Sequence, residues 1–111
     1  MEFNIQRNTF VSAIRRTLGI VEKKTTMPIL NNVLIQAKAA GITIVATDME
    51  ITLVANYEAE IVSEGEITVS AKRLYDIIRE NPEGIVQVAT TASNVLILTC
   101  QKSVYRINGL P

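Results

Sequence analysis

Basic side chains at helical spacing are the residues of this chain best suited to chemistry, and that chemistry is electrostatic contact with phosphate groups. At 100° per residue, Arg15 and Arg16 lie opposite the apolar side of one predicted helix. Lys72, Asp76 and Arg79 form a stripe opposite the apolar side of a second predicted helix. Lys and Arg held on rigid helices can contact phosphates without reading bases. Because the acids Asp76 and Glu80 reduce the positive charge of the second stripe, the sequence predicts weak binding by each helix.

The formal net charge is zero, but the charges are segregated along the chain. Residues 6–24 hold five basic residues and one acid, whereas residues 48–66 hold six acids and no base. The five basic residues are Arg7, Arg15, Arg16, Lys23 and Lys24. This pattern predicts a particle with a cationic side and an anionic side, and the local field decides what a surface attracts. Charges that only decorate solvated faces are the alternative.

Residues suited to catalysis are few. The chain has no His, which removes the commonest general base and metal ligand. Cys100 lies in an apolar, strand-like stretch, which is typical of a buried structural thiol. Asp48 and Glu50 flank Met49 at a predicted strand corner and are interpreted as turn and surface groups rather than metal ligands. The sequence therefore predicts a protein that is not an enzyme and has no cofactor or metal site.

Length and composition indicate one sheet-rich domain. The chain has 111 residues, 48% of them hydrophobic, with many Val, Ile and Thr and no Trp. Its longest apolar runs are far shorter than the roughly 20 residues that span a bilayer. Cys100 is the only cysteine, so no internal disulfide can form. A soluble, cytoplasmic protein is expected.

One strand-helix unit occurs twice, 64 positions apart, in residues 3–16 and 67–80. Both segments begin with the alternation of a half-buried strand and continue with the three-and-four spacing of a buried helical stripe. The matched apolar positions are Phe3 with Ile67, Ile5 with Val69, Phe10 with Leu74, Ala13 with Ile77, and Ile14 with Ile78. The match predicts two similar halves, although short apolar patterns also align by chance.

The predicted order of elements is β-α-β-β-β, twice, giving an α+β fold with two helices packed on antiparallel sheets. The first helix is capped by Asn8 and ends near Gly19, while the second is capped by Ser70 and ends at Asn81-Pro82. The predicted strands cover residues 2–6, 30–37, 42–47, 51–61, 66–69, 85–90, 95–100 and 103–108.

Four segments together resemble a known family. They are TMPILNNVLI (26–35), ATDMEITL (46–53), TVSAKRLYDII (68–78) and YRINGLP (105–111). In this order and spacing they resemble the N-terminal domain of the bacterial DNA polymerase III beta subunit, the sliding clamp, over essentially the whole chain. The resemblance implies a DNA-clamp fold and a non-catalytic processivity factor for DNA replication. In that family, two protomers of three similar domains close head to tail into a ring that encircles duplex DNA and tethers the polymerase.

The resemblance also implies roles for basic residues. Lys24 precedes the Pro-Ile-Leu segment where the family contacts DNA, and Lys72, Arg73 and Arg79 match the basic residues of the second helix. These contacts are expected to be independent of base sequence. For Arg15 and Arg16, which would also face the hole of the ring, the family pattern is loose. Solvated surface charge is the alternative reading for those two.

The last predicted strand, 103–108, is implied to be the edge that pairs with the other clamp protomer. Tyr105 and Ile107 would supply apolar contact there, with Ile77 nearby and Lys102 as an ionic partner. An ordinary core position is the alternative for Tyr105.

The chain stops at Pro111, where the first domain of the family ends. The second and third domains are absent, together with the pocket that the clamp loader and the polymerase occupy in that family. A fragment or excised domain with a single exposed edge is therefore expected. The rival hypothesis is an interaction module that pairs through its edge strand and does not bind DNA; salt-dependent DNA binding separates the two.

Overall fold

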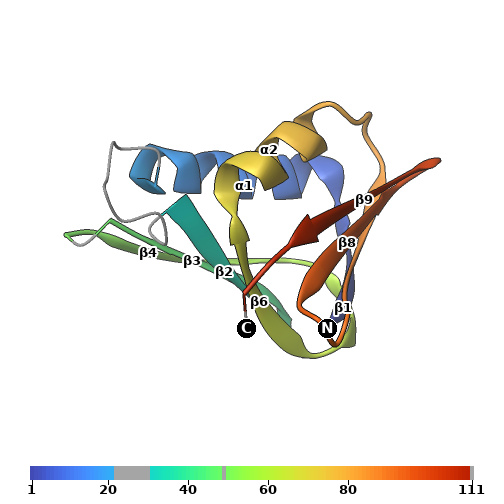
Figure 1. The fold of residues 1–111 in the computed structure, drawn as a ribbon, viewed down its shortest axis with the longest axis horizontal. Coiled ribbons are helices and arrows are strands. Elements are labelled where there is room, and N and C mark those ends of the chain that lie inside the picture. The colour runs from blue at the N-terminus through green and yellow to red at the C-terminus, as the bar shows by residue number, and fades with distance from the viewer. Residues whose placement is uncertain (22–30, 49, 111) are drawn as a thin grey trace.

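A computed structural model describes residues 1–21, 31–48 and 50–110, and it places two helices over one side of two antiparallel sheets (Figure 1). In chain order the elements are β1 (Glu2–Gln6), α1 (Arg7–Val21), β2 (Asn32–Lys38), β3 (Gly41–Thr47), β4 (Thr52–Tyr57), β5 (Glu60–Ser63), β6 (Gly65–Ser70), α2 (Ala71–Arg79), β7 (Ile85–Thr90), β8 (Val95–Cys100) and β9 (Ser103–Asn108). The predicted α+β class is confirmed.

The strand order of the two sheets reflects the predicted repeat. One sheet has the order β5-β1-β7-β8-β9 and the other β4-β3-β2-β6. Without β5, each sheet contains the first strand of one half followed by the three later strands of the other half. The run β1-β7-β8-β9 is therefore equivalent to the run β6-β2-β3-β4. The sequence match between the halves corresponds to a symmetric exchange of their first strands.

One predicted strand was wrong. Residues 51–61 were expected to form a single strand, but the structure divides them into β4 and β5, which belong to different sheets. Neither Glu58 nor Ala59 is in a strand, and the chain crosses from one sheet to the other at these two residues. A short strand of four residues then pairs with β1.

The helix ends agree with prediction in α2 but not in α1. Ser70 Oγ accepts a hydrogen bond of 3.3 Å from Arg73 N, and the helix ends before Asn81-Pro82, as predicted. In α1 the chain passes directly from β1 into helix at Arg7, so Asn8 lies inside the first turn and is not the cap. Gly19 is an exposed residue within the helix rather than the residue after it.

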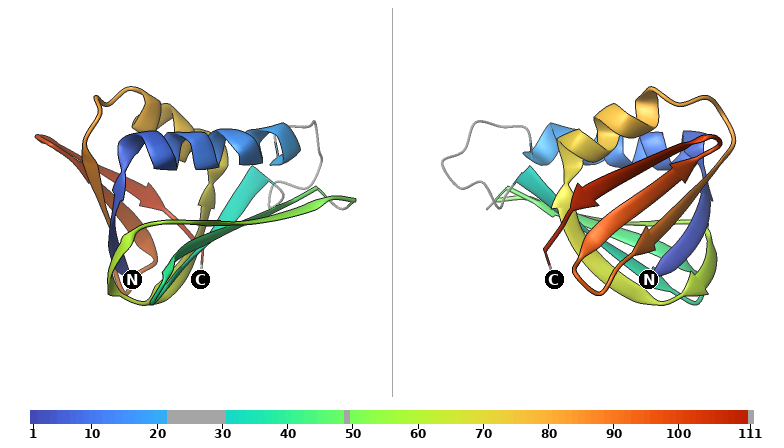
Figure 2. Two further views of the ribbon diagram at one scale, coloured as in Figure 1. Left: turned by 180° about the vertical axis from the view of Figure 1, so that it is seen from behind. Right: turned by 45° about the vertical axis from the view of Figure 1, so that its right-hand side comes forward.

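The core lies between the helices and the two sheets (Figure 2). The apolar stripes of both helices are buried, and Phe3 meets Phe10 edge to face, with ring centroids 6.1 Å apart. The first-strand residues of both halves are buried against the same core. Within the described part of the chain, no helix is long and apolar enough to cross a membrane.

Candidate nucleic-acid interface

The stripe predicted on α2 is present, and its charges are paired. Asp76 Oδ2 lies 3.2 Å from Lys72 Nζ, and Asp76 Oδ1 lies 3.6 Å from Arg79 Nε. The three side chains are exposed to solvent by 67% for Lys72, 41% for Asp76 and 52% for Arg79. The Arg79 guanidinium also lies 5.7 Å from the centre of the Tyr75 ring. The exposed side of α2 is therefore a small ion-pair network with an excess of positive charge.

A residue of α1 fixes the end of α2. Arg7 Nη2 donates a 2.9 Å hydrogen bond to Arg79 O, and Arg7 Nε donates a 3.3 Å bond to Ile78 O. These carbonyls belong to the last turn of α2, where the helix dipole favours a cation. From the sequence, Arg7 was expected only to be one of the five basic residues of a cationic side. Its partners lie more than 70 positions away, so no local pattern indicated this role.

The other predicted DNA-contacting residues of the helices are exposed. Arg15 and Arg16 are on α1 and Arg73 is on α2. Within the described ranges, none of these three side chains has a hydrogen-bond or ion-pair partner. Both helices lie over the same side of the sheets, so their solvent-facing residues form one surface (Figure 2). Lys24 lies outside the described residues.

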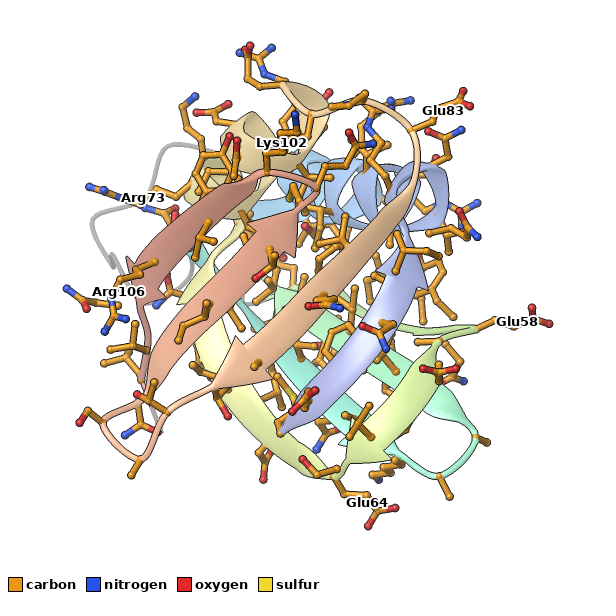
Figure 3. The ribbon with its side chains drawn as sticks, turned by 90° about the vertical axis from the view of Figure 1, so that its right-hand side faces the viewer. Glu58, Glu64, Arg73, Glu83, Lys102 and Arg106 are labelled. Atoms are coloured by element: carbon orange, nitrogen blue, oxygen red, sulfur yellow. The ribbon has the colours of Figure 1, made fainter. Side chains whose placement is uncertain are left out.

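The acidic segment is located away from this surface. Figure 3 shows Glu58 and Glu64 on the strands and turns remote from the helices, while Arg73 lies beside α2. Glu60 and Glu66 are exposed in the same part of the chain. These four acids and the cations of the helices therefore occupy separate regions of the folded surface, although Asp76 lies among the cations of α2.

The strand β9 is a free edge, as predicted. It pairs with β8 on one side, from Val95 opposite Asn108 to Cys100 opposite Ser103, and has no strand partner on its other side among the described residues. Its unpaired backbone groups are available to another chain. Lys102 is exposed in the turn that precedes the strand.

The side chains of β9 differ from expectation in one respect. Ile107 is only 6% exposed and belongs to the core of this domain, so its side chain is not open to a partner as expected. Tyr105 and Ile77 are partly buried and pack against the same core. The apolar side chain that β9 does expose is Val104, at 63%. An interface role for these residues remains a prediction.

A polar contact connects β9 to the end of α2. Asn81, which is buried, donates hydrogen bonds of 2.7 Å to Ile77 O and 3.3 Å to Tyr105 OH. A hollow of about 570 Å³ lies beside this contact, between α2 and β9. Its lining residues are Arg73, Asp76, Ile77, Arg106, Ile107 and Asn108. The amide of Asn81 thus links the edge strand β9 to the helix α2, whose apolar side chains share one core with those of β9.

A second free edge was missed by sequence analysis. β4 is the last strand of its sheet and occupies the position equivalent to β9. It exposes Val54, as β9 exposes Val104. Because residues 51–61 were predicted as one strand, the end of the sheet at β4 was not recognised from the sequence. In the described part of the chain, β5 and β6 end the two sheets at their other sides, and β4 and β9 are the two edge strands that the repeat makes equivalent.

The residues considered for catalysis have structural positions. Cys100 is buried in β8, and burial raises the pKa of its thiol. Asp48 Oδ1 accepts hydrogen bonds from Glu50 N at 3.0 Å and Ile51 N at 2.8 Å, which is the geometry of a turn. The described residues include no group of three or more His, Cys, Asp or Glu that could hold a metal ion.

Solved sliding clamps share this fold. The structure of the DNA polymerase sliding clamp from Caulobacter crescentus superposes with a TM-score of 0.92 at 29% identity, covering 100% of this chain and 30% of that one. The beta subunit from DNA polymerase of Streptococcus pyogenes superposes with a TM-score of 0.94 at 25% identity, with the same coverage. The fold is that of a clamp domain, as the resemblance implied.

The sequence defines the family directly. Residues 1–111 match the family described as DNA polymerase III beta subunit, N-terminal domain, and the chain belongs to this family. It is 31% identical to the beta sliding clamp of Pseudomonas aeruginosa over 112 residues, or 100% of this chain. It is 33% identical to that of Caulobacter vibrioides over 84 residues, which cover 76% of this chain and 23% of the relative. The chain spans 30% of the length of the Pseudomonas relative.

Proposed function

We propose that this chain acts as the first domain of a sliding clamp, a DNA replication processivity factor that encircles duplex DNA and tethers the replicative polymerase. The observation that supports this function best is the single surface formed by the exposed sides of α1 and α2, where Arg15, Arg16, Lys72, Arg73 and Arg79 are all exposed. Glu58 and Glu64 of the acidic segment lie away from the helices (Figure 3). Family membership supports duplex DNA as the partner of this surface, and contacts to phosphates would not read the bases. Such a function is cytoplasmic.

The edge strands support assembly with further clamp domains. In this proposal, β9 pairs with a domain of the other protomer, and Tyr105 and Lys102 contribute to the contact. Because β4 is an equivalent free edge, the domain can be joined on two sides. The clamp loader and DNA polymerase III are the other proposed partners, and they would act through clamp domains other than residues 1–111.

Duplex binding as a function of salt tests the proposal. Three or four phosphate contacts predict that log affinity falls with log salt at a slope of magnitude about 3 to 4. Binding should be independent of DNA sequence. Replacing Lys24, Lys72, Arg73 and Arg79 by Ala should abolish binding and leave the free energy of unfolding nearly unchanged.

A charge-matched pair of variants separates a local effect from net charge. Lys72→Ala with Arg79→Ala should lower the slope by about 2, since two contacts are lost. Lys38→Glu changes the net charge by the same amount at an exposed strand position and should leave the slope unchanged. Equal effects of the double change and of Lys38→Glu, or binding that is indifferent to salt, would contradict the proposal. A lack of any duplex binding would favour the rival function, an interaction module that pairs through an edge strand without contacting DNA.

A further inference from the structure

Asp76 is placed where a phosphate would have to bind. Its two carboxylate oxygens are used separately, Oδ2 toward Lys72 Nζ and Oδ1 toward Arg79 Nε, at 3.2 and 3.6 Å. Two of the cations on the exposed side of α2 are therefore occupied by the same carboxylate at once. Arg73, on the same helix, has no such partner among the described residues.

Stability does not account for Asp76. Ion pairs between exposed side chains contribute little to folding because solvent screens them. A Lys that precedes its acid by four residues is also the less favourable orientation on a helix. Asp has a low helix propensity. Glu, or a neutral residue with a higher helix propensity, would stabilise the helix more at this position. The arrangement is therefore more informative about binding than about folding.

We infer that Asp76 competes with DNA phosphates for Lys72 and Arg79 and so lowers the affinity of α2 for the duplex. A phosphate that approaches either cation must displace a carboxylate oxygen, and when the phosphate leaves the carboxylate takes its place again. Each contact between a phosphate and a cation thereby has a lower affinity and a shorter lifetime. This suits a protein that must move along DNA without pausing, and the inference rests on the proposed function.

Removal of the carboxylate by Asp76→Asn tests the inference directly. The variant keeps the size of the side chain and should raise the affinity for duplex DNA at low salt, roughly twofold to tenfold for two exposed ion pairs. Glu64→Gln is the matched control, because Glu64 is exposed, remote from the helices and gives the same change in net charge (Figure 3). The control should change affinity by much less. Equal gains for the two variants would overturn the inference.

A double-mutant cycle shows whether Asp76 acts through its partners. If it acts by pairing, the gain from Asp76→Asn should largely disappear when Lys72 and Arg79 are already Ala. A gain of the same size in that background would mean that Asp76 merely repels DNA through its field, and the pairing would be refuted. Asp76→Ala should reproduce the gain of Asp76→Asn, which excludes an effect of the new amide.

A measurement without DNA keeps this inference separate from the proposed function. On immobilised heparin, a sulfated polyanion, Asp76→Asn should elute at higher salt than the wild type and Glu64→Gln. If no variant binds duplex DNA while this shift is seen, the proposed function fails and the competition of Asp76 for anions stands. If DNA is bound but the heparin shift and the affinity gain are both absent, the inference fails alone.

Discussion

Replacement of Ile107 by Ala should destabilise the isolated domain, although Ile107 lies on a free edge strand. Its side chain is 6% exposed and it pairs with Leu96 of β8, which is fully buried. Truncation removes three carbon atoms and leaves a cavity, and such changes at buried positions cost about 2 to 5 kcal/mol. Because β9 is an edge with a hollow beside it, the site can relax in part, and we expect a loss of about 2 to 3 kcal/mol.

Val104 provides the matched control on the same strand. Its side chain is 63% exposed on the opposite face of β9, so Val104→Ala should change the free energy of unfolding by less than about 0.5 kcal/mol. Urea unfolding of both variants gives the two values, and an unchanged m-value would show that the unfolded states are comparable. If Ile107→Ala proved as stable as Val104→Ala, the assignment of Ile107 to the core would be wrong.

The result also determines how the edge should be tested as an interface. A loss of ring closure caused by Ile107→Ala would be ambiguous, because unfolding and lost contact would give the same readout. Val104 and Tyr105 are better probes, since Val104 is exposed and Tyr105 is only partly buried. Tyr105→Phe removes the hydroxyl that bonds Asn81 while keeping the ring.

Two further predictions concern buried or tethering groups. Arg7→Ala should lower the free energy of unfolding, measured in urea, by about 1 to 3 kcal/mol, because two carbonyls of α2 lose a charged donor. Arg16→Ala, at an exposed position, is the control and should change this free energy little. The raised pKa of Cys100 favours the neutral thiol in the folded state, so stability should fall as pH rises above about 8.5, the pKa of an unfolded cysteine. When the free energy of unfolding is measured against pH, its fall at alkaline pH should be smaller in Cys100→Ala than in the wild type. An identical fall in both proteins would contradict this prediction.

Local signals were sufficient for most of the second half of the chain. The strands 85–90, 95–100 and 103–108 were predicted with the bounds that the structure shows, since alternating apolar residues were separated by clear turns. Ser70 was recognised as a cap because its hydroxyl serves the first turn of the helix that follows it. These features depend on neighbours in sequence, so sequence patterns reveal them.

Features that depend on distant partners were not predicted. Alternation places Tyr105 and Ile107 on one face of β9, but only the packing of α2 determines that this face is the inner one. Asn8 resembles a cap, yet β1 continues directly into α1 and Arg7 N bonds to Gly84 O at 2.8 Å instead. For the candidate site, helical spacing predicted which cations face solvent. It could not show that Arg7 secures the end of α2.

The symmetry of the fold relates the cationic surface to the free edges. The halves exchange their first strands, so β4 and β9 end their sheets in equivalent positions while both helices remain on one side. If β9 of one such domain pairs with β4 of the next, the helix-covered sides of the two sheets are continuous. The helices of successive domains then face the same way. A head-to-tail contact of this kind generates a ring when its rotation closes. The internal repeat of this domain therefore accounts both for the equivalent edge strands and for the placement of the two helices on one side.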